Sequence, residues 1–133
     1  MTASADLPVA LVSTDLWLQS RVAALARGAG TALSVVARPP VPGAAALVLV
    51  DCNERQEERV ALIAGLVAEA PGRRVAAILP HKDVQTQAAA RAAGACRCVP
   101  NSALATVLPR MMRPGPVGEA GAPAVRLGVR STP

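Results

Sequence analysis

The segment "AALVLVD", which ends at Asp51, limits the possible folds of this chain more than any other stretch. Six consecutive apolar residues precede the aspartate, and the charged segment "ERQEER" follows within a few residues. A short, uninterrupted apolar run is typical of a strand that is buried on both faces, as in parallel sheets. Asp51 is therefore predicted to lie at the carboxyl end of such a strand, where open α/β sheets place their functional groups.

The same pattern recurs along most of the chain. Strands are predicted at residues 8–13, 31–37, 45–51, 75–80 and 95–100, and helices at 15–28, 54–70, 82–94 and 102–112. The segment "RPPVPG" between the second and third strands indicates a rigid turn. We interpret the whole as a five-fold alternation of strand and helix. It predicts an α/β domain in which helices cover both faces of a five-stranded parallel sheet.

The composition fits one globular domain followed by a tail. The chain has 133 residues, of which 52% are hydrophobic and 17% charged, so it can bury the core of one domain. We place this domain from Pro8 to Met112. The segment from Arg113 to Pro133 is rich in proline and glycine and has no periodicity, so we expect it to be a flexible tail.

Charge and apolar patterning exclude several classes of protein. The net charge of +5 comes mostly from arginines scattered singly, and Trp17 is the only aromatic residue, so nucleic-acid binding is not indicated. Charged or turn residues interrupt every apolar run, so no membrane span is predicted. An odd number of cysteines and the lack of a signal-peptide pattern lead us to expect a cytoplasmic protein.

The residues after the predicted strands do not form a familiar cofactor or metal site. The turn after the first strand, "VSTDLWLQ", has no glycine to admit a dinucleotide pyrophosphate. A structural zinc would need Cys96 and Cys98 to be completed by Cys52 and His81. Free cysteines are more often buried as small apolar residues, which is what we expect here. We expect His81 to be an exposed loop residue.

The alternation, with Asp51 closing the third strand and "AGACRCVPNS" entering the fifth, resembles the receiver domain of bacterial response regulators. The resemblance implies a flavodoxin-like fold with strand order 2-1-3-4-5. It further implies that the third-strand aspartate accepts a phosphoryl group from a histidine kinase. In that family two acidic residues after the first strand hold Mg²⁺. A hydroxyl after the fourth strand and a lysine after the fifth bind the phosphoryl oxygens, and an aromatic on the fifth strand reports the change.

Carried over residue by residue, the resemblance leaves Asp51 without its partners. The acidic pair corresponds to Ser13 and Thr14, which are neutral. The hydroxyl position corresponds to Pro80 and the aromatic to Cys98. The lysine position corresponds to Asn101, or to Pro100 if the register slips by one. Phosphoryl transfer depends on Mg²⁺ and cationic groups to neutralise charge, so Asp51 alone is expected to bind Mg²⁺ only weakly.

A second interpretation of Asp51 is structural. Asp51 precedes Glu54 by three residues, and Asn53 precedes Gln56 by three, and both spacings fit a capping box at the start of the second predicted helix. We favour capping over phosphorylation at this position. Asp15, just beyond the degenerate acidic pair, is expected to start or cap the first helix.

Together these features predict a pseudo-receiver: a non-enzymatic, phosphorylation-independent protein-interaction module in bacterial signal transduction or transcriptional regulation, with no cofactor. In the family, the face formed by the fourth helix, fifth strand and last helix binds partners or makes homodimers. Here that surface would run from Lys82 to Gly94 and from Ser102 to Met112. The alternatives are a single-domain response regulator phosphorylated on Asp51, a flavodoxin-like protein binding a flavin-type ligand through Ser13 and Thr14, and a DNA-associated regulator.

Overall fold

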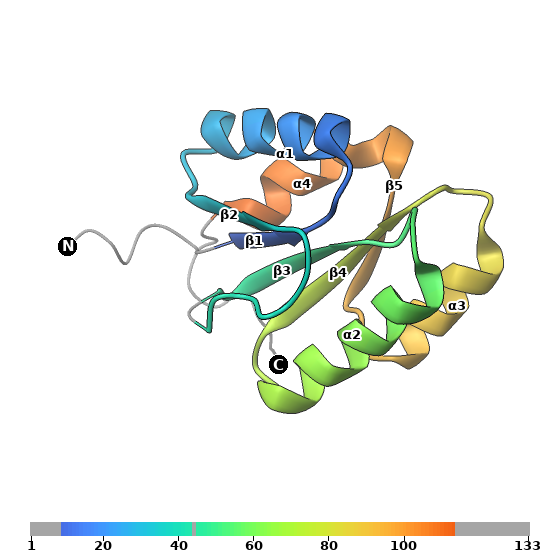
Figure 1. Ribbon diagram of the computed structural model, residues 1–133. Helices are drawn as coiled ribbons and strands as arrows, with labels where there is room; N and C mark the ends of the chain where they lie inside the picture. Colours follow the sequence, from blue (N-terminus) through green and yellow to red (C-terminus); the bar gives the residue numbers. More distant parts are fainter. Residues whose placement is uncertain (1–8, 44, 114–133) are drawn as a thin grey trace, which may run out of the picture.

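The computed structural model describes residues 9–43 and 45–113 as five strands, four α-helices and one turn of 3₁₀ helix (Figure 1). In chain order these are β1 (Val9–Val12), α1 (Leu16–Gly28), β2 (Leu33–Val36), β3 (Leu47–Asp51), α2 (Gln56–Glu69), β4 (Arg74–Leu79), α3 (Val84–Ala92), β5 (Arg97–Pro100), η2 (Asn101–Ala103) and α4 (Leu104–Met112). No helix in the described residues is long and apolar enough to cross a membrane.

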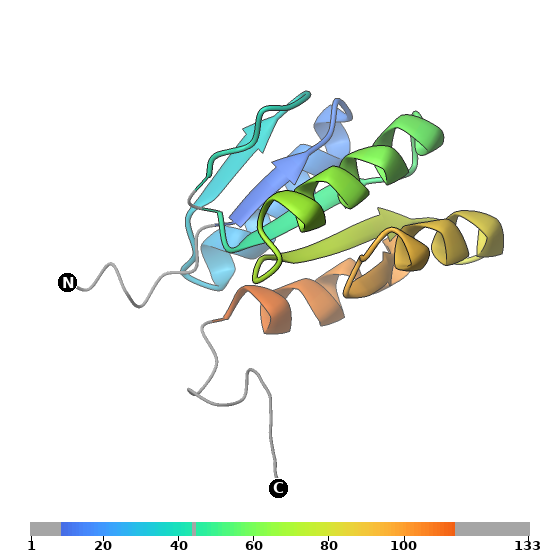
Figure 2. The same cartoon turned by 90° about the horizontal axis from the view of Figure 1, so that it is seen from below.

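The strands form one parallel sheet in the order β2-β1-β3-β4-β5. Helices α1 and α4 cover one face and α2 and α3 the other, as Figures 1 and 2 show. The predicted α/β class, with the strand order 2-1-3-4-5 and helices on both faces, is confirmed. Because all strands run the same way, their carboxyl ends meet at one edge of the sheet.

Strand β3 is central and buried along its whole length, which explains the uninterrupted apolar run in the sequence. Leu47 and Leu49 face the core under α1 and α4, whereas Val48 and Val50 face the core under α2 and α3. This alternation follows from the two-residue period of a strand. Asp51 is the last residue of β3 and is fully buried at the edge of the sheet.

The connection between β2 and β3 contains the rigid turn that the segment "RPPVPG" predicts. Its described residues, 37–43 and 45–46, contain no helix. The physical reason lies in Pro39, Pro40 and Pro42, because proline lacks the N–H that a helix interior needs and clashes with the preceding turn. The predicted turn, residues 38–43, therefore lies in a crossover whose described residues place no helix on the sheet beside α2.

The last helix is anchored to the rest of the domain by its C-terminal end. Met112 is fully buried and Met111 nearly so, which makes them core residues and not a surface patch. The carbonyl oxygen of Met112 accepts a hydrogen bond from Thr31 Oγ1 at 3.2 Å, and that of Met111 accepts one from Arg74 Nη2 at 2.8 Å. Of the predicted tail, Arg113 to Pro133, all residues from 114 on lie outside the described residues.

Gly94 offers a test of how α3 ends. It has φ +113°, the amide of Ala95 donates to the carbonyl of Ala90, and an added Cβ would lie 3.0 Å from a methyl group of Val67. Gly94→Ala should therefore lower the free energy of unfolding by about 1–3 kcal/mol, measured by urea denaturation. The control is Gly65→Ala within α2, where a Cβ meets nothing within 4 Å. That change should raise stability by about 0.5–1 kcal/mol, and equal effects at both sites would contradict this account.

Candidate functional site

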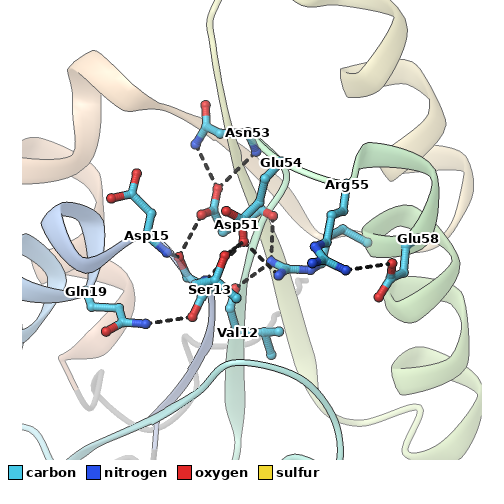
Figure 3. A network of polar contacts seen from close by, with 11 residues as sticks. Val12, Ser13, Asp15, Gln19, Asp51, Asn53, Glu54, Arg55 and Glu58 are labelled. Carbon is cyan, nitrogen blue, oxygen red and sulfur yellow. Dashed lines mark hydrogen bonds and ion pairs between the residues drawn. The ribbon is translucent and has the colours of Figure 1, made fainter.

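Asp51 lies at the carboxyl end of β3 with both carboxylate oxygens occupied by neutral donors (Figure 3). Oδ2 accepts a hydrogen bond from Ser13 Oγ at 2.7 Å. Oδ1 accepts from the backbone N–H and from Nδ2 of Asn53, each at 2.9 Å. Because Asp51 is fully buried, these three donors replace the water that would otherwise solvate the carboxylate.

The capping interpretation of Asp51 is wrong. Helix α2 begins at Gln56, five residues beyond Asp51, and its N-cap residue is Arg55, which has φ 47° and makes no side-chain cap. Asp51 instead bonds the amide two residues on, as aspartates do in turns. The pairing of Asn53 with Gln56 does not form either, since Gln56 Nε2 donates to Asp83 Oδ2 at 2.7 Å. The turn at residues 52–53 and the bend at 54–55 place the start of α2 out of reach of Asp51.

A buried arginine from α2 joins the ends of β1 and β3. Arg59 is 3% exposed, and its Nη1 donates to the carbonyl oxygens of Val12 at 3.1 Å and Asp51 at 2.9 Å. Its Nη2 donates to Glu54 Oε2 at 2.8 Å. The same Glu54 oxygen accepts the backbone N–H of Thr14 at 3.0 Å and its hydroxyl at 2.6 Å. We call Thr14, Glu54 and Arg59 the strand-end latch.

The latch favours an ionised Glu54. Partial burial alone would raise the pKa of Glu54, but the hydrogen bonds from Thr14 and the charge and hydrogen bond of Arg59 outweigh it. The pKa of Glu54 therefore lies below its ordinary value. A guanidinium so deeply buried needs this carboxylate, because an unpaired buried charge is strongly destabilising.

The structure brings together some of the positions carried over from the receiver domain and separates others. Ser13 contacts Asp51 directly, whereas Thr14 reaches only Glu54. Asn101 pairs with Asn53 through two amide hydrogen bonds, of 2.8 and 3.0 Å, and so touches Asp51 only through that residue. The remaining two are elsewhere: Cys98 Sγ lies 3.7 Å from the carbonyl oxygen of Gln87 on α3, and Pro80 stands in the turn after β4.

Three expectations about neighbouring residues have clear outcomes. Asp15 caps α1, since its Oδ1 accepts the amides of Trp17 at 2.9 Å and Leu18 at 3.3 Å, as predicted. His81 is exposed, also as predicted. The cysteines differ from the expectation of burial: Cys52 is fully buried, but Cys98 is only partly buried and Cys96 is exposed.

Cys52 is the one thiol of the three that lies beside Asp51 in the chain and is fully buried. Burial, followed by the negative charge of Asp51, raises its pKa to about 12. The thiol therefore stays protonated at neutral pH and is unsuited to act as a nucleophile or metal ligand. Within the described residues, no group of three or more histidine, cysteine, aspartate or glutamate side chains is placed to hold a metal ion.

Sequence reasoning missed Glu54 and Arg59 as members of the site. A signal existed for Arg59: it precedes Ile63 by four residues and Leu66 by seven, so it falls on the buried stripe of α2. A charged residue on such a stripe needs a buried partner. Val60, which the sequence pattern favours for the core, is only partly buried.

Comparison with protein-family models and with curated proteins found no match. Solved structures do match. A CheY-like protein, tadZ, from Pseudomonas aeruginosa has a TM-score of 0.70 and 20% identity over 80% of this chain and 96% of that one. A putative pilus assembly-related protein from Burkholderia pseudomallei has a TM-score of 0.66 and 19% identity over 78% and 87%.

A response regulator receiver protein from Pseudoalteromonas atlantica also matches, with a TM-score of 0.66 and 14% identity over 77% of this chain and 91% of that one. These similarities establish that the chain has the fold of response regulator receiver domains, as the sequence resemblance implied. With identities this low they extend to the fold alone.

Loss of the Glu54 charge should destabilise the protein in a pH-dependent way. At pH 7, Glu54→Gln should lower the free energy of unfolding by about 1–3 kcal/mol, because Arg59 stays buried without its carboxylate. The pKa of Glu54 is lower in the folded than in the unfolded state. Its contribution is therefore fully present above the ordinary value of about 4.3 and is lost as the pH falls through the folded-state pKa.

Urea denaturation of both proteins between neutral and acidic pH measures this difference. The matched control is Glu58→Gln, because Glu58 pairs with Arg55 at 3.6 Å and both side chains are 62% exposed. That change should cost about 0.5–1 kcal/mol at most. A Glu54→Gln effect no larger than the control, or one that persists undiminished in acid, would contradict the latch.

Proposed function

We propose that this protein is a pseudo-receiver that acts as a protein-interaction module without phosphorylation. The proposal rests on the hydrogen bonding of Asp51. Its carboxylate is fully buried, and its two oxygens already accept three hydrogen bonds from Ser13 and Asn53. To attack a phosphoryl donor, one of these oxygens must give up its donors and become accessible.

The charge distribution at the site supports the same proposal. A transferred phosphoryl group needs Mg²⁺ and cationic groups that neutralise its oxygens, and Mg²⁺ is usually held through one or two carboxylates. Here Asp15, the nearest acidic residue on the first loop, accepts two amides of α1. The Arg59 guanidinium already occupies the carbonyl oxygens of Val12 and Asp51 and repels a divalent cation at this edge.

An interaction surface is available on α3. Val84, at the start of this helix, is 69% exposed, and Ala88, Ala89 and Ala92 are exposed beside it. The small alanine side chains let another backbone approach closely, and the exposed side chain of Val84 offers it an apolar contact. We propose that this surface, with the exposed side of α4, makes a homodimer or binds a partner protein in the cytoplasm.

The similarity to solved structures suggests a biological context. Two of the matching proteins are described as pilus assembly-related and as a CheY-like tadZ protein. We include in the proposal that this chain regulates pilus assembly through protein contacts, with no enzymatic activity and no cofactor. The flavin alternative loses support because the hydroxyls of Ser13 and Thr14 are donated to Asp51 and Glu54.

Exposure to acetyl phosphate and Mg²⁺ tests phosphorylation independence. Intact mass spectrometry should show no species heavier by one phosphoryl group, because the Asp51 carboxylate is occupied and no carboxylate completes a metal site. Mg²⁺ should also shift the unfolding midpoint equally in the wild type and in Asp51→Asn, since specific binding would stabilise only the former. A phosphorylated species that is absent from Asp51→Asn would overturn the proposal in favour of a phosphorylatable single-domain regulator.

Self-association through α3 is tested by sedimentation equilibrium. Val84→Asp should shift the protein to a monomer while α3 stays folded, because an acidic residue in the first turn suits the helix dipole. Leu16→Asp is the matched control: Leu16 opens α1, is 77% exposed and lies away from α3. It should leave the association constant unchanged. An equal loss of self-association in both variants would argue against α3 as the dimer surface. A monomeric wild type would rule out the homodimer.

A further inference from the structure

The helix-free connection between β2 and β3 leaves two adjoining cavities beside α2. One, of about 190 Å³, is lined by Arg38, Arg55 and Arg59 together with Thr14 and Glu58. The other, of about 380 Å³, is lined mainly by apolar or small residues, Pro39, Ala61, Leu62 and Gly65. Glu58 and Arg59 line both cavities, so the two adjoin; we call the pair the hollow, with a cationic end and an apolar end. Neither includes Asp51.

The cationic end has a surplus of positive charge. Arg55 pairs with Glu58 at 3.6 Å, and Arg59 pairs with Glu54 at 2.8 Å. Arg38 forms no ion pair with any residue in the described part of the chain and is exposed at the rim. Two of the three guanidinium groups are therefore paired with carboxylates, and the positive charge of Arg38 is left without a partner in the described residues.

The guanidinium of Arg59 is a rigid part of the lining at the cationic end. Its Nη atoms are fixed by Val12, Asp51 and Glu54, whereas its Nε–H has no acceptor among the described residues. The guanidinium is thus held in place with a donor to spare.

From this arrangement we propose that the hollow binds a small organic phosphate, with the phosphate among Arg38, Arg55 and Arg59 and an apolar or planar group over Leu62 and Gly65. Planar forked guanidinium groups suit phosphate oxygens, and the adjoining apolar wall suits an attached ring. The two cavities together have the size of small-molecule pockets, about 300–1,000 Å³. This site goes beyond the proposed function, which needs no ligand.

The experiment is calorimetric titration of the full chain with phenyl phosphate and, separately, with inorganic phosphate. The wild type should bind phenyl phosphate with a Kd of about 1 mM or tighter, and about tenfold more tightly than inorganic phosphate. Arg38→Ala should weaken both probes about tenfold. Arg27→Ala removes the same charge from the far end of α1 and should leave both affinities unchanged.

Gly65 allows the apolar end to be tested by itself. A Cβ at Gly65 meets nothing within 4 Å and no positive φ is recorded there, so Gly65→Leu should fold and fill the apolar cavity. It should reduce phenyl phosphate binding to the level of inorganic phosphate and leave inorganic phosphate unaffected, with folding checked by circular dichroism.

Three results would overturn the site: no saturable binding to the wild type, equal losses in Arg27→Ala and Arg38→Ala, or full phenyl phosphate affinity in Gly65→Leu. The acetyl phosphate experiment reports on Asp51 with separate residues and a separate readout. A failure of the ligand site therefore leaves the pseudo-receiver proposal standing, and the reverse also holds.

Discussion

The buried guanidinium of Arg59 is the interaction on which the edge of the sheet depends. It ties the last carbonyls of β1 and β3 to α2, and through Glu54 it fixes the loop that begins at Thr14. Buried ion pairs are costly to form but far more costly to break, so this one is a stronger constraint on conformation than a source of stability. The guanidinium of Arg59 is a permanent positive charge at the carboxyl ends of the strands. At this edge of the sheet, receiver domains bind an exchangeable metal ion.

The hydrogen bonds around Asp51 change how an aspartate at the end of the central strand is interpreted. Asp51 occupies the end of the central strand, yet its oxygens bond to Ser13 and Asn53, and Asn53 bonds in turn to Asn101. The side chains that surround it are neutral donors with fixed partners. In our proposal this network holds one conformation, whereas a phosphorylation switch needs two conformations of similar free energy.

The fold could be predicted from the sequence to a large extent, because it depends on local patterns. The run before Asp51 marks the central strand, Gly94 marks the end of α3, and Asp15 marks the start of α1. The site could be predicted only in part. The capping box failed because its three-residue spacing matches the sequence of many turns, and only the backbone at Arg55 decides where α2 begins. The partnership of Glu54 with Thr14 spans forty residues, and no local pattern reports such a contact.

The lack of a helix in the described connection between β2 and β3 also affects local unfolding of the domain. Strand β2 is four residues long, lies at the edge of the sheet and pairs with β1 alone, and its middle residues, Ser34 and Val35, are exposed. Each of the other strands, by contrast, is followed by a helix that packs on the sheet, whereas the described residues after β2 contain none. The amides of β2 therefore belong to a segment of low local stability, and they should exchange with solvent by an opening that leaves β3 and β4 intact.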